Sequence, residues 1–175
     1  MDEKGLIEKV KRGNRKAMDE LVKLHYRKVF AYFYRNTGDY HRSCDLTQEV
    51  FIKAISAIPV YKNNGKFKAW LFSIASNHLR NDWRYRKLHP QEEWKEKDGG
   101  PPENSGETRK AELEEAMGRL PRKQREALVL KYYHGLKASE IAKVTHVREA
   151  TVKSRLKYGL EKLRKLLGDD EDGKG

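Results

Sequence analysis

The sequence is poor in the residues that build disulfides, metal sites and membrane spans. Cys44 is the one cysteine among 175 residues, which excludes an intramolecular disulfide and a metal site made of several cysteines. The six histidines are scattered without the spacing of metal ligands. No stretch approaches the roughly 20 apolar residues that cross a bilayer, and the first residues, MDEKGLIEK, are unlike a signal peptide. We therefore expect a soluble cytoplasmic protein without membrane insertion.

Motifs of catalytic sites are also missing. The chain has no HExxH motif, no P-loop and no Asp/Glu cluster suited to two metals. We therefore expect no enzymatic activity, no cofactor, no bound metal and no small-molecule substrate.

Positive charge is abundant and unevenly distributed. The net charge is +12, with a pI near 9.7, which favours a polyanionic partner because neutralising phosphates releases counterions. Residues 1–90 carry 19 Lys/Arg against 9 Asp/Glu, and residues 111–168 carry 14 against 7. Between them, residues 91–110 carry 4 against 6 and are rich in Pro and Gly, with Trp94 as their one large apolar residue. This pattern predicts two basic domains joined by a flexible acidic linker, which could place them at separated sites on one duplex.

Helical periodicity dominates the pattern, and the alternation typical of strands is almost absent. We predict an all-α protein of two small helical domains. Asn14 and Asp39 are expected to cap helices that end near Gly38 and Ala57, and a further helix is expected over 67–87. In the second domain we predict helices over 111–118 and 121–134, then a helical pair over 135–167.

The helix expected after Asp39 carries a polar and acidic side. Asp45, Gln48, Glu49 and Ile52 share one side at i, i+3, i+4 and i+7. One interpretation is a docking face for another protein. The other is that Asp45 begins a helix, with Gln48 completing a capping box. The pattern alone does not choose between them.

The helix over 67–87 has two contrasting sides. Phe67, Trp70 and Leu71 are expected in the core, along with Ile74, His78 and Tyr85. The opposite side is a row of donors suited to phosphates and bases, made of Ser73, Ser76, Asn77, Arg80, Arg84 and Lys87. Phe72 and Trp83 lie off the core line and are expected to be exposed or interfacial. The preceding loop could hold an extruded base through Tyr61 and small amides, or its Asn-Asn-Gly could simply form a turn.

The stretch GLKASEIAKVTHVREATVKSRLKYGLEKLRKLL, residues 135–167, organises the second domain. Its apolar residues can bury one side of two helices joined by a tight turn, while the second helix is rich in cations. That is the helix-turn-helix geometry that inserts its second helix into the major groove. An ordinary αα-hairpin with solvated cations is the alternative.

Three motifs resemble bacterial sigma factors, specifically the small extracytoplasmic-function (ECF) group of the sigma-70 family. They are DLTQEVFIKA at 45–54, FKAWLFSIASNHLRND at 67–82, and LPRKQREALVLKYYHGLKASEIA with TVKSRL between 120 and 156. The resemblance implies a region-2-like helical bundle over 1–88 and a region-4-like helix-turn-helix domain over 111–168. Residues 89–110 are then the linker, and 169–175 an acidic disordered tail.

The resemblance also implies partners and residue roles. The partners are core RNA polymerase, promoter DNA and an anti-sigma factor. Polymerase binding falls to Asp45, Gln48, Glu49, Ile52 and Lys53. Binding of the −10 element falls to Tyr61, Lys62, Asn63, Asn64, Gly65, Lys66, Asn77, Arg80, Asn81, Arg84 and Lys87. Binding of the −35 element falls to Lys137, Arg148, Glu149, Thr151, Lys153, Ser154, Arg155 and Lys157.

The implied activity is transcription initiation, in which the protein directs polymerase to the −35 and −10 elements and helps to melt the −10 region. The alternative is a stand-alone helix-turn-helix regulator. The sequence departs from its relatives at three positions. They usually have Ser or Thr in place of Lys137, Ser in place of Arg148, and Gly in place of His146. We expect the first two departures to remove helix N-caps, and His146 to adopt a left-handed turn conformation.

Overall fold

The computed structural model of the chain describes residues 2–89 and 108–168. Most of the expected linker over 89–110, namely residues 90–107 with Trp94, and the expected tail over 169–175 lie outside the described residues. Across the part of the chain that the structure describes, every regular element is a helix and none is a strand. The predicted all-α class is therefore confirmed.

The N-terminal unit contains α1 (Glu3–Lys11), α2 (Arg15–Thr37), α3 (Tyr40–Ala57), a 3₁₀ turn η1 (Ile58–Val60) and α4 (Phe67–Leu88). Local capping explains the boundaries. The Asn14 side chain accepts from the Ala17 N–H at 3.0 Å at the start of α2, and Gly38 ends that helix with a φ of 72°. The Asp39 carboxylate then accepts from the Arg42 N–H at 3.0 Å and starts α3. These predicted caps are confirmed.

The C-terminal unit contains α5 (Thr108–Gly118), α6 (Arg122–Leu128), a π-helical turn η3 (Val129–Tyr133), α7 (Ala138–Thr145) and α8 (Glu149–Leu167). Helix α5 begins three residues before the expected boundary at 111. The single helix expected over 121–134 is α-helical only to Leu128 and continues as a π-helical turn. A π-helical turn holds more residues than a regular α-helical turn, so a 3.6-residue period does not predict it. Gly135, with a φ of 70°, ends this segment.

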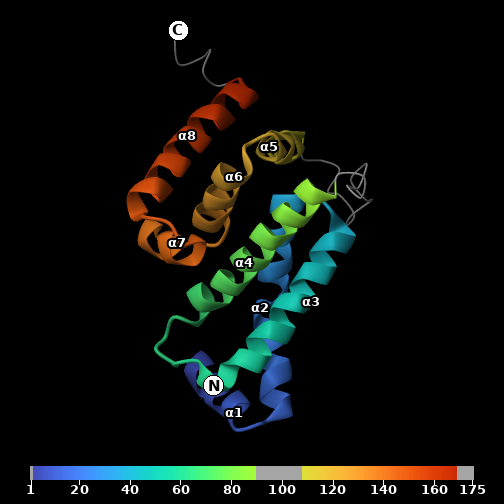
Figure 1. The fold of residues 1–175 in the computed structure, drawn as a ribbon, viewed down its shortest axis with the longest axis vertical. Helices are drawn as coiled ribbons and strands as arrows, with labels where there is room; N and C mark the ends of the chain where they lie inside the picture. Colours follow the sequence, from blue (N-terminus) through green and yellow to red (C-terminus); the bar gives the residue numbers. More distant parts are fainter. Residues whose placement is uncertain (1, 90–107, 169–175) are drawn as a thin grey trace.

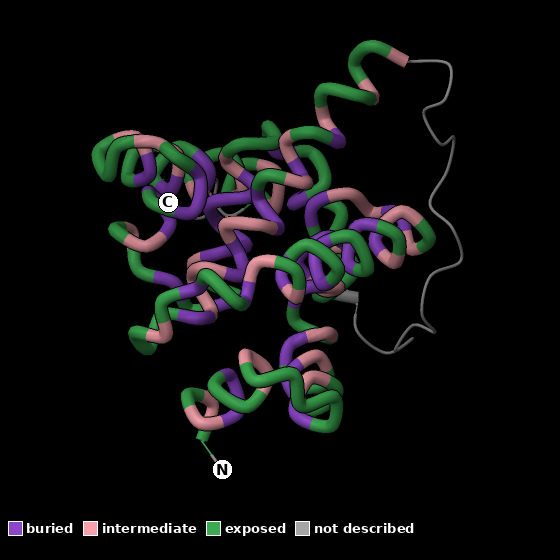
Figure 2. Tube along the Cα trace, turned by 60° about the horizontal axis from the view of Figure 1, so that its bottom comes forward, coloured by how far each residue is buried: buried purple, intermediate pink, exposed green. Residues whose placement is uncertain are grey.

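The two units pack directly against each other around α4. Helix α4 lies between α3 on one side and the α6–α7 pair on the other (Figure 1), and it contacts both α3 and α7. Buried apolar residues from both units form one contiguous cluster, and the buried parts of the helices face inward (Figure 2). Tyr32, Phe33 and Phe72 are its largest side chains that are fully enclosed. The described residues thus form one folded body.

The packing changes the expected sides of α4. Phe72 is only 1% exposed, and its ring lies 5.4 Å from that of Tyr32 and 4.7 Å from that of His134. The interfacial alternative for Phe72 is therefore confirmed. Ser76, expected on the donor side, is wholly buried, whereas Tyr85, expected in the core, is 43% exposed. Both expectations were wrong because the C-terminal unit covers one side of α4 and leaves the last turns of the helix open.

Candidate nucleic-acid interface

Helix α3 presents a surface that no other part of the described chain covers. Asp45, Gln48, Glu49 and Lys53 are exposed there, and Ile52 is 70% exposed. The opposite side of the helix buries Leu46, Val50, Phe51 and Ala54 against the core. We call these five exposed residues the α3 face.

The capping-box interpretation of Asp45 is wrong. Helix α3 begins at Tyr40 with Asp39 as its cap, so Asp45 lies well inside the helix. Its carboxylate has no terminal N–H group to satisfy there. The exposed acid and its neighbour Gln48 are therefore free for an external partner.

The loop before α4 offers only part of the site that the sequence suggested. Tyr61 is 7% exposed and packs against Phe67 and Trp70, with ring centroids 5.6 and 4.6 Å away. Its ring is therefore not available for stacking on a base in this arrangement. The loop that carries Tyr61 is held against α1, because the Asn63 side-chain amide donates to the Lys4 carbonyl and to the Glu8 carboxylate, both at 2.9 Å.

The rest of this loop is open to solvent. Lys62, Asn64, Gly65 and Lys66 are exposed. Gly65 has a φ of 84°, which a residue with a side chain rarely adopts, and the Asn64 side-chain amide oxygen accepts from the Lys66 N–H at 3.2 Å. The turn interpretation of Asn-Asn-Gly is thus confirmed, and it leaves two lysines projecting beside the start of α4.

The outer side of α4 carries paired donors. The Arg80 guanidinium donates to Asn77 and, at 2.8 Å, to the Ser76 hydroxyl. The Arg84 guanidinium donates to Asn81 at 3.2 Å. Asn77, Asn81, Arg84 and Lys87 are exposed, and Arg80 is half-buried. We call these five residues the α4 donor face. The i, i+3 pairing orients the guanidinium groups along the helix, where phosphates could be bound.

A buried carboxylate joins α4 to the C-terminal unit. Glu126 of α6 is 2% exposed. One of its oxygens accepts from the Tyr32 hydroxyl at 2.5 Å and from the Ser76 hydroxyl at 2.7 Å. Ser76 in turn accepts from Arg80 of the α4 donor face. We call Tyr32, Ser76 and Glu126 the interdomain triad.

Burial governs the titration of the triad. Loss of solvent raises the pKa of Glu126, and the hydrogen bonds from Tyr32 and Ser76 partly oppose that rise. Burial, with the nearby Glu126 charge, also raises the pKa of Tyr32 well above its usual value. Tyr32 therefore stays a donor at neutral pH. The hydrogen bonds from Tyr32 and Ser76 to Glu126 form only while the two units are in contact.

A second contact lies beside the triad. The Lys68 ammonium of α4 donates to the backbone carbonyl of His134. The His134 ring is 6% exposed, and burial together with the charges of Arg35, Lys68 and Lys28 lowers its pKa to about 4. A neutral imidazole is thus part of the packing between the units.

The helix-turn-helix prediction is confirmed in its geometry. Helix α7 ends at His146, whose φ of 59° is left-handed as expected, and α8 begins three residues later. Val152 and Leu156 of α8 are buried, and Gly159 lets α8 approach α6 so closely that a Cβ there would lie 3.1 Å from Leu128. The opposite side of α8 is left facing solvent.

The start of α8 carries the residues that the sequence assigned to DNA. Lys153 forms an exposed ion pair with Glu149 at 3.4 Å, which contributes little to stability and can exchange for a phosphate. Thr151 and Arg155 are half-buried at its edges. We call this surface the α8 face; its exposed members are Arg148, Glu149, Lys153, Ser154 and Lys157. Lys137 is also exposed, at the N-cap position directly before α7.

The expected loss of helix caps is seen. Neither Lys137 nor Arg148 makes a side-chain hydrogen bond to its helix. Half of a capping box survives at α7, where Glu140 accepts from the Lys137 N–H at 2.9 Å. Thr145 does not supply the missing N-cap of α8, because its hydroxyl donates to the Ile141 carbonyl within α7 at 2.7 Å.

Sequence reasoning missed the interdomain triad. Tyr32 and Glu126 are 94 positions apart, so no local pattern joins them. One signal was present: Glu126 stands directly before the apolar run Ala127–Leu130, where a charged residue on a short helix must either face water or find buried partners.

Comparisons with known proteins match both units. The family model for sigma-70 region 2 matches residues 21–88, and that for sigma-70 region 4 matches residues 110–163. The ECF RNA polymerase sigma factor SigW of Bacillus subtilis is 32% identical over 180 residues, covering 93% of this chain and 95% of SigW. The sigma factor RpoE of Bartonella quintana, solved with the anti-sigma factor NepR, has a TM-score of 0.77 at 24% identity, covering 87% of this chain and 98% of RpoE. CnrH, solved with the cytosolic domain of CnrY, has a TM-score of 0.70 at 26% identity, covering 95% of this chain and 97% of CnrH.

The two family matches, together with the helix-turn-helix geometry of α7 and α8, define the class of protein as a transcription initiation factor. The chain belongs to the sigma-70 family, and within it to the ECF group of RNA polymerase sigma factors. It is a sigma factor for transcription initiation, and the stand-alone regulator is not favoured. Sigma factors are not catalytic enzymes, and those of this group act on RNA polymerase in the cell interior.

Over residues 2–89 and 108–168, no three His, Cys, Asp or Glu side chains gather in a way that could hold a metal ion. Over the same ranges, no helix combines the length and the apolar character required to cross a bilayer.

Proposed function

We propose that residues 1–88 dock on core RNA polymerase through the α3 face and hold the −10 strand with the α4 donor face and the lysines of the preceding loop. Residues 111–168 hold the −35 element through the α8 face, and the segment 89–110 connects the two. The observation that carries this proposal is the α3 face itself. It combines exposed acids with a 70% exposed Ile52 on a helix whose opposite side is buried in the core.

The promoter-bound form requires the two units to separate. Simultaneous contacts with two promoter elements about two helical turns apart need the units to sit tens of ångströms from each other. The hydrogen bonds of 2.5 and 2.7 Å in the interdomain triad hold them in contact. The described arrangement is therefore a closed form, in which Arg80 is partly engaged by Ser76.

An anti-sigma factor is the expected protein antagonist. RpoE, which shares the fold, was solved in complex with the anti-sigma factor NepR, and CnrH was solved in complex with the cytosolic domain of CnrY. We extend that partner class to this chain, which would act in the bacterial cytoplasm without catalysing a reaction of its own.

Run-off transcription with core polymerase tests the proposal. Wild-type protein is expected to support initiation on its genomic promoters. Lys153→Ala and Arg155→Ala are each expected to lower the slope of promoter affinity against salt by about one, as the loss of one phosphate contact predicts. An unchanged slope for both variants would remove the α8 face from the proposal. Glu161→Ala, on the exposed later part of α8, is the matched control.

A further inference from the structure

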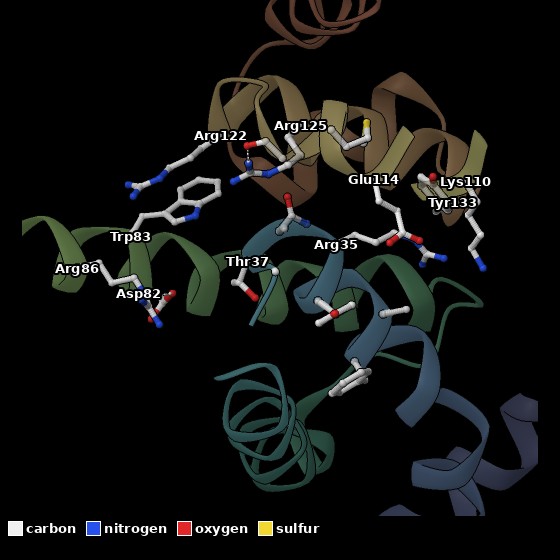
Figure 3. Close-up of a pocket in the computed structure, with 17 residues that line it drawn as sticks. Arg35, Thr37, Asp82, Trp83, Arg86, Lys110, Glu114, Arg122, Arg125 and Tyr133 are labelled. Carbon is white, nitrogen blue, oxygen red and sulfur yellow. Dashed lines mark hydrogen bonds and ion pairs between the residues drawn. The ribbon is translucent and has the colours of Figure 1, made fainter. Parts of the chain in front are cut away.

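A cavity of about 560 Å³ lies between the two units. Its walls come from the end of α2, the last turns of α4, helix α5 and the start of α6 (Figure 3). This volume lies within the ~300–1,000 Å³ range of small-molecule sites, which favour the junctions between domains. The α3 face and the α8 face do not contribute to it.

The cavity has an excess of positive charge. Asp82 in its wall is neutralised by Arg42 and by Arg86, the latter at 3.3 Å. Four other cations line the cavity, namely Arg35, Lys110, Arg122 and Arg125, against the single remaining acid Glu114. Within the described ranges, none of these four cations forms an ion pair at 4.0 Å or less. The site is therefore suited to a polyanion.

Arg125 gives the strongest argument that the cavity suits an anion. Its side chain is only 9% exposed, and its one hydrogen bond is to the Gly118 carbonyl at 3.1 Å. Its Nε is buried without a partner. Burial and the neighbouring Arg122 lower the pKa of Arg125 to about 10. A buried cation of this kind is costly unless an anion accompanies it.

A neutral polar group and two aromatic rings complete the walls. Asn36 is 2% exposed, and its side-chain oxygen is buried without a donor. Arg122 lies over the Trp83 ring at 5.8 Å from the centroid (Figure 3), and Arg35 lies over the Tyr133 ring at 3.9 Å. The cavity thus offers donors to phosphate, one acceptor for an N–H or O–H group, and flat surfaces for a ring.

We propose that this cavity binds a nucleoside polyphosphate, with Arg122 and Arg125 on its phosphates, Asn36 accepting from the base or sugar, and Trp83 beside the ring. The inference goes beyond promoter and polymerase binding, which use other surfaces. Because both units supply its walls, the ligand binds the closed form in preference to the open form. By linkage it stabilises that form in proportion to its concentration over its dissociation constant.

Isothermal titration calorimetry of the full chain tests the proposal with three probes: ADP, pyrophosphate and adenosine. ADP is expected to bind saturably at a one-to-one ratio, with pyrophosphate weaker and adenosine weakest. Arg122→Gln and Arg125→Gln should each weaken ADP binding about tenfold or more, since each removes a charge-assisted hydrogen bond. Arg119→Gln is the matched control, because Arg119 is 64% exposed in its side chain and pairs with Glu115 outside the cavity.

Three outcomes overturn the proposal. The first is the absence of saturable heat with ADP at about 1 mM, where binding would be weaker than about −4 kcal/mol. The second is an equal loss in Arg119→Gln, which would show a general charge effect. The third is pyrophosphate binding as tightly as ADP, which removes the nucleoside. Arg122 is exposed, so its variant keeps the test valid even where circular dichroism shows that Arg125→Gln is unfolded. Promoter-DNA binding by the chain together with core polymerase, measured without nucleotides, reports on the proposed function separately.

Discussion

Ser76→Ala is the most direct test of the contact between the two units. The Ser76 hydroxyl donates to Glu126 at 2.7 Å across the interface. In the open form the same hydroxyl would face water or the backbone of its own helix. Its removal therefore costs the closed form free energy while leaving each separate unit nearly unchanged.

The size of the effect follows from the burial of its partner. A hydrogen bond to a charged acceptor contributes about 1.5–3 kcal/mol, and Glu126 is only 2% exposed, so water does not replace the lost donor. Because each 1.4 kcal/mol is about tenfold in an equilibrium constant, the ratio of closed to open form should fall roughly 10- to 100-fold. Tyr32→Phe, which removes the other donor at 2.5 Å, should have an effect of the same order.

Single-molecule energy transfer can count the two forms. One dye is attached to Cys44, the one cysteine of the chain, and the other to Lys162→Cys on the exposed side of α8. Ser73→Ala is the control, since the Ser73 hydroxyl donates at 3.0 Å to the Ala69 carbonyl within α4. If the triad holds the two units together, Ser76→Ala should raise the fraction of open molecules and Ser73→Ala should not.

An equal open fraction in the two serine variants would refute the reasoning. Glu126 supplies a further check. Glu126→Ala leaves two buried hydroxyls without an acceptor and should open the protein. Glu126→Gln keeps an acceptor oxygen for the two hydroxyls, so the closed form should persist.

Three further measurements address other parts of the molecule. Asp45→Ala combined with Gln48→Ala should keep the helical circular dichroism spectrum, because both side chains are exposed in mid-helix, while the affinity for core polymerase falls about tenfold or more. An unfolded double variant would contradict this. Arg148→Ser should restore the N-cap of α8 and raise the free energy of unfolding by about 0.5–2 kcal/mol in urea titration; a fall would show that Arg148 has another stabilising role. His134, whose pKa is lowered from 6.5 to about 4, stabilises the closed form above pH 6.5 and loses that contribution as pH falls. In a Glu126→Gln background, which removes the opposing carboxyl titration, the closed form should lose about 2 kcal/mol by pH 5, and no change in open fraction would reject this role.

The fold was predictable where local chemistry decides it. Asn14, Gly38 and Asp39 set helix ends through contacts with residues no more than four positions away, so the sequence carries that information directly. The left-handed turn at His146 was predictable for the same reason. The outer side of α3 was also predictable, because one face of an amphipathic helix is buried and the other is exposed.

The candidate site was harder to predict where it depends on distant residues. The pattern placed Ser76 with the donors of α4, but its true surroundings come from Glu126, which is 50 positions away. Tyr61 showed the same limit, since the tie between Asn63 and Lys4, 59 positions apart, turns the loop so that the ring faces inward. Arg125 gave no sequence signal that distinguished it from a solvated cation. The residue-by-residue roles toward polymerase and DNA stay predictions.

The burial of Phe72 has a consequence for the lifetime of the protein in the cell. Its ring is 1% exposed only because Tyr32 and His134 pack against it. A copy whose units have parted shows this aromatic surface to chaperones and proteases, which act on such exposed groups. Open protein that meets no polymerase should therefore be degraded faster than the closed form. The amount of open protein would then fall by degradation as well as by return to the closed form.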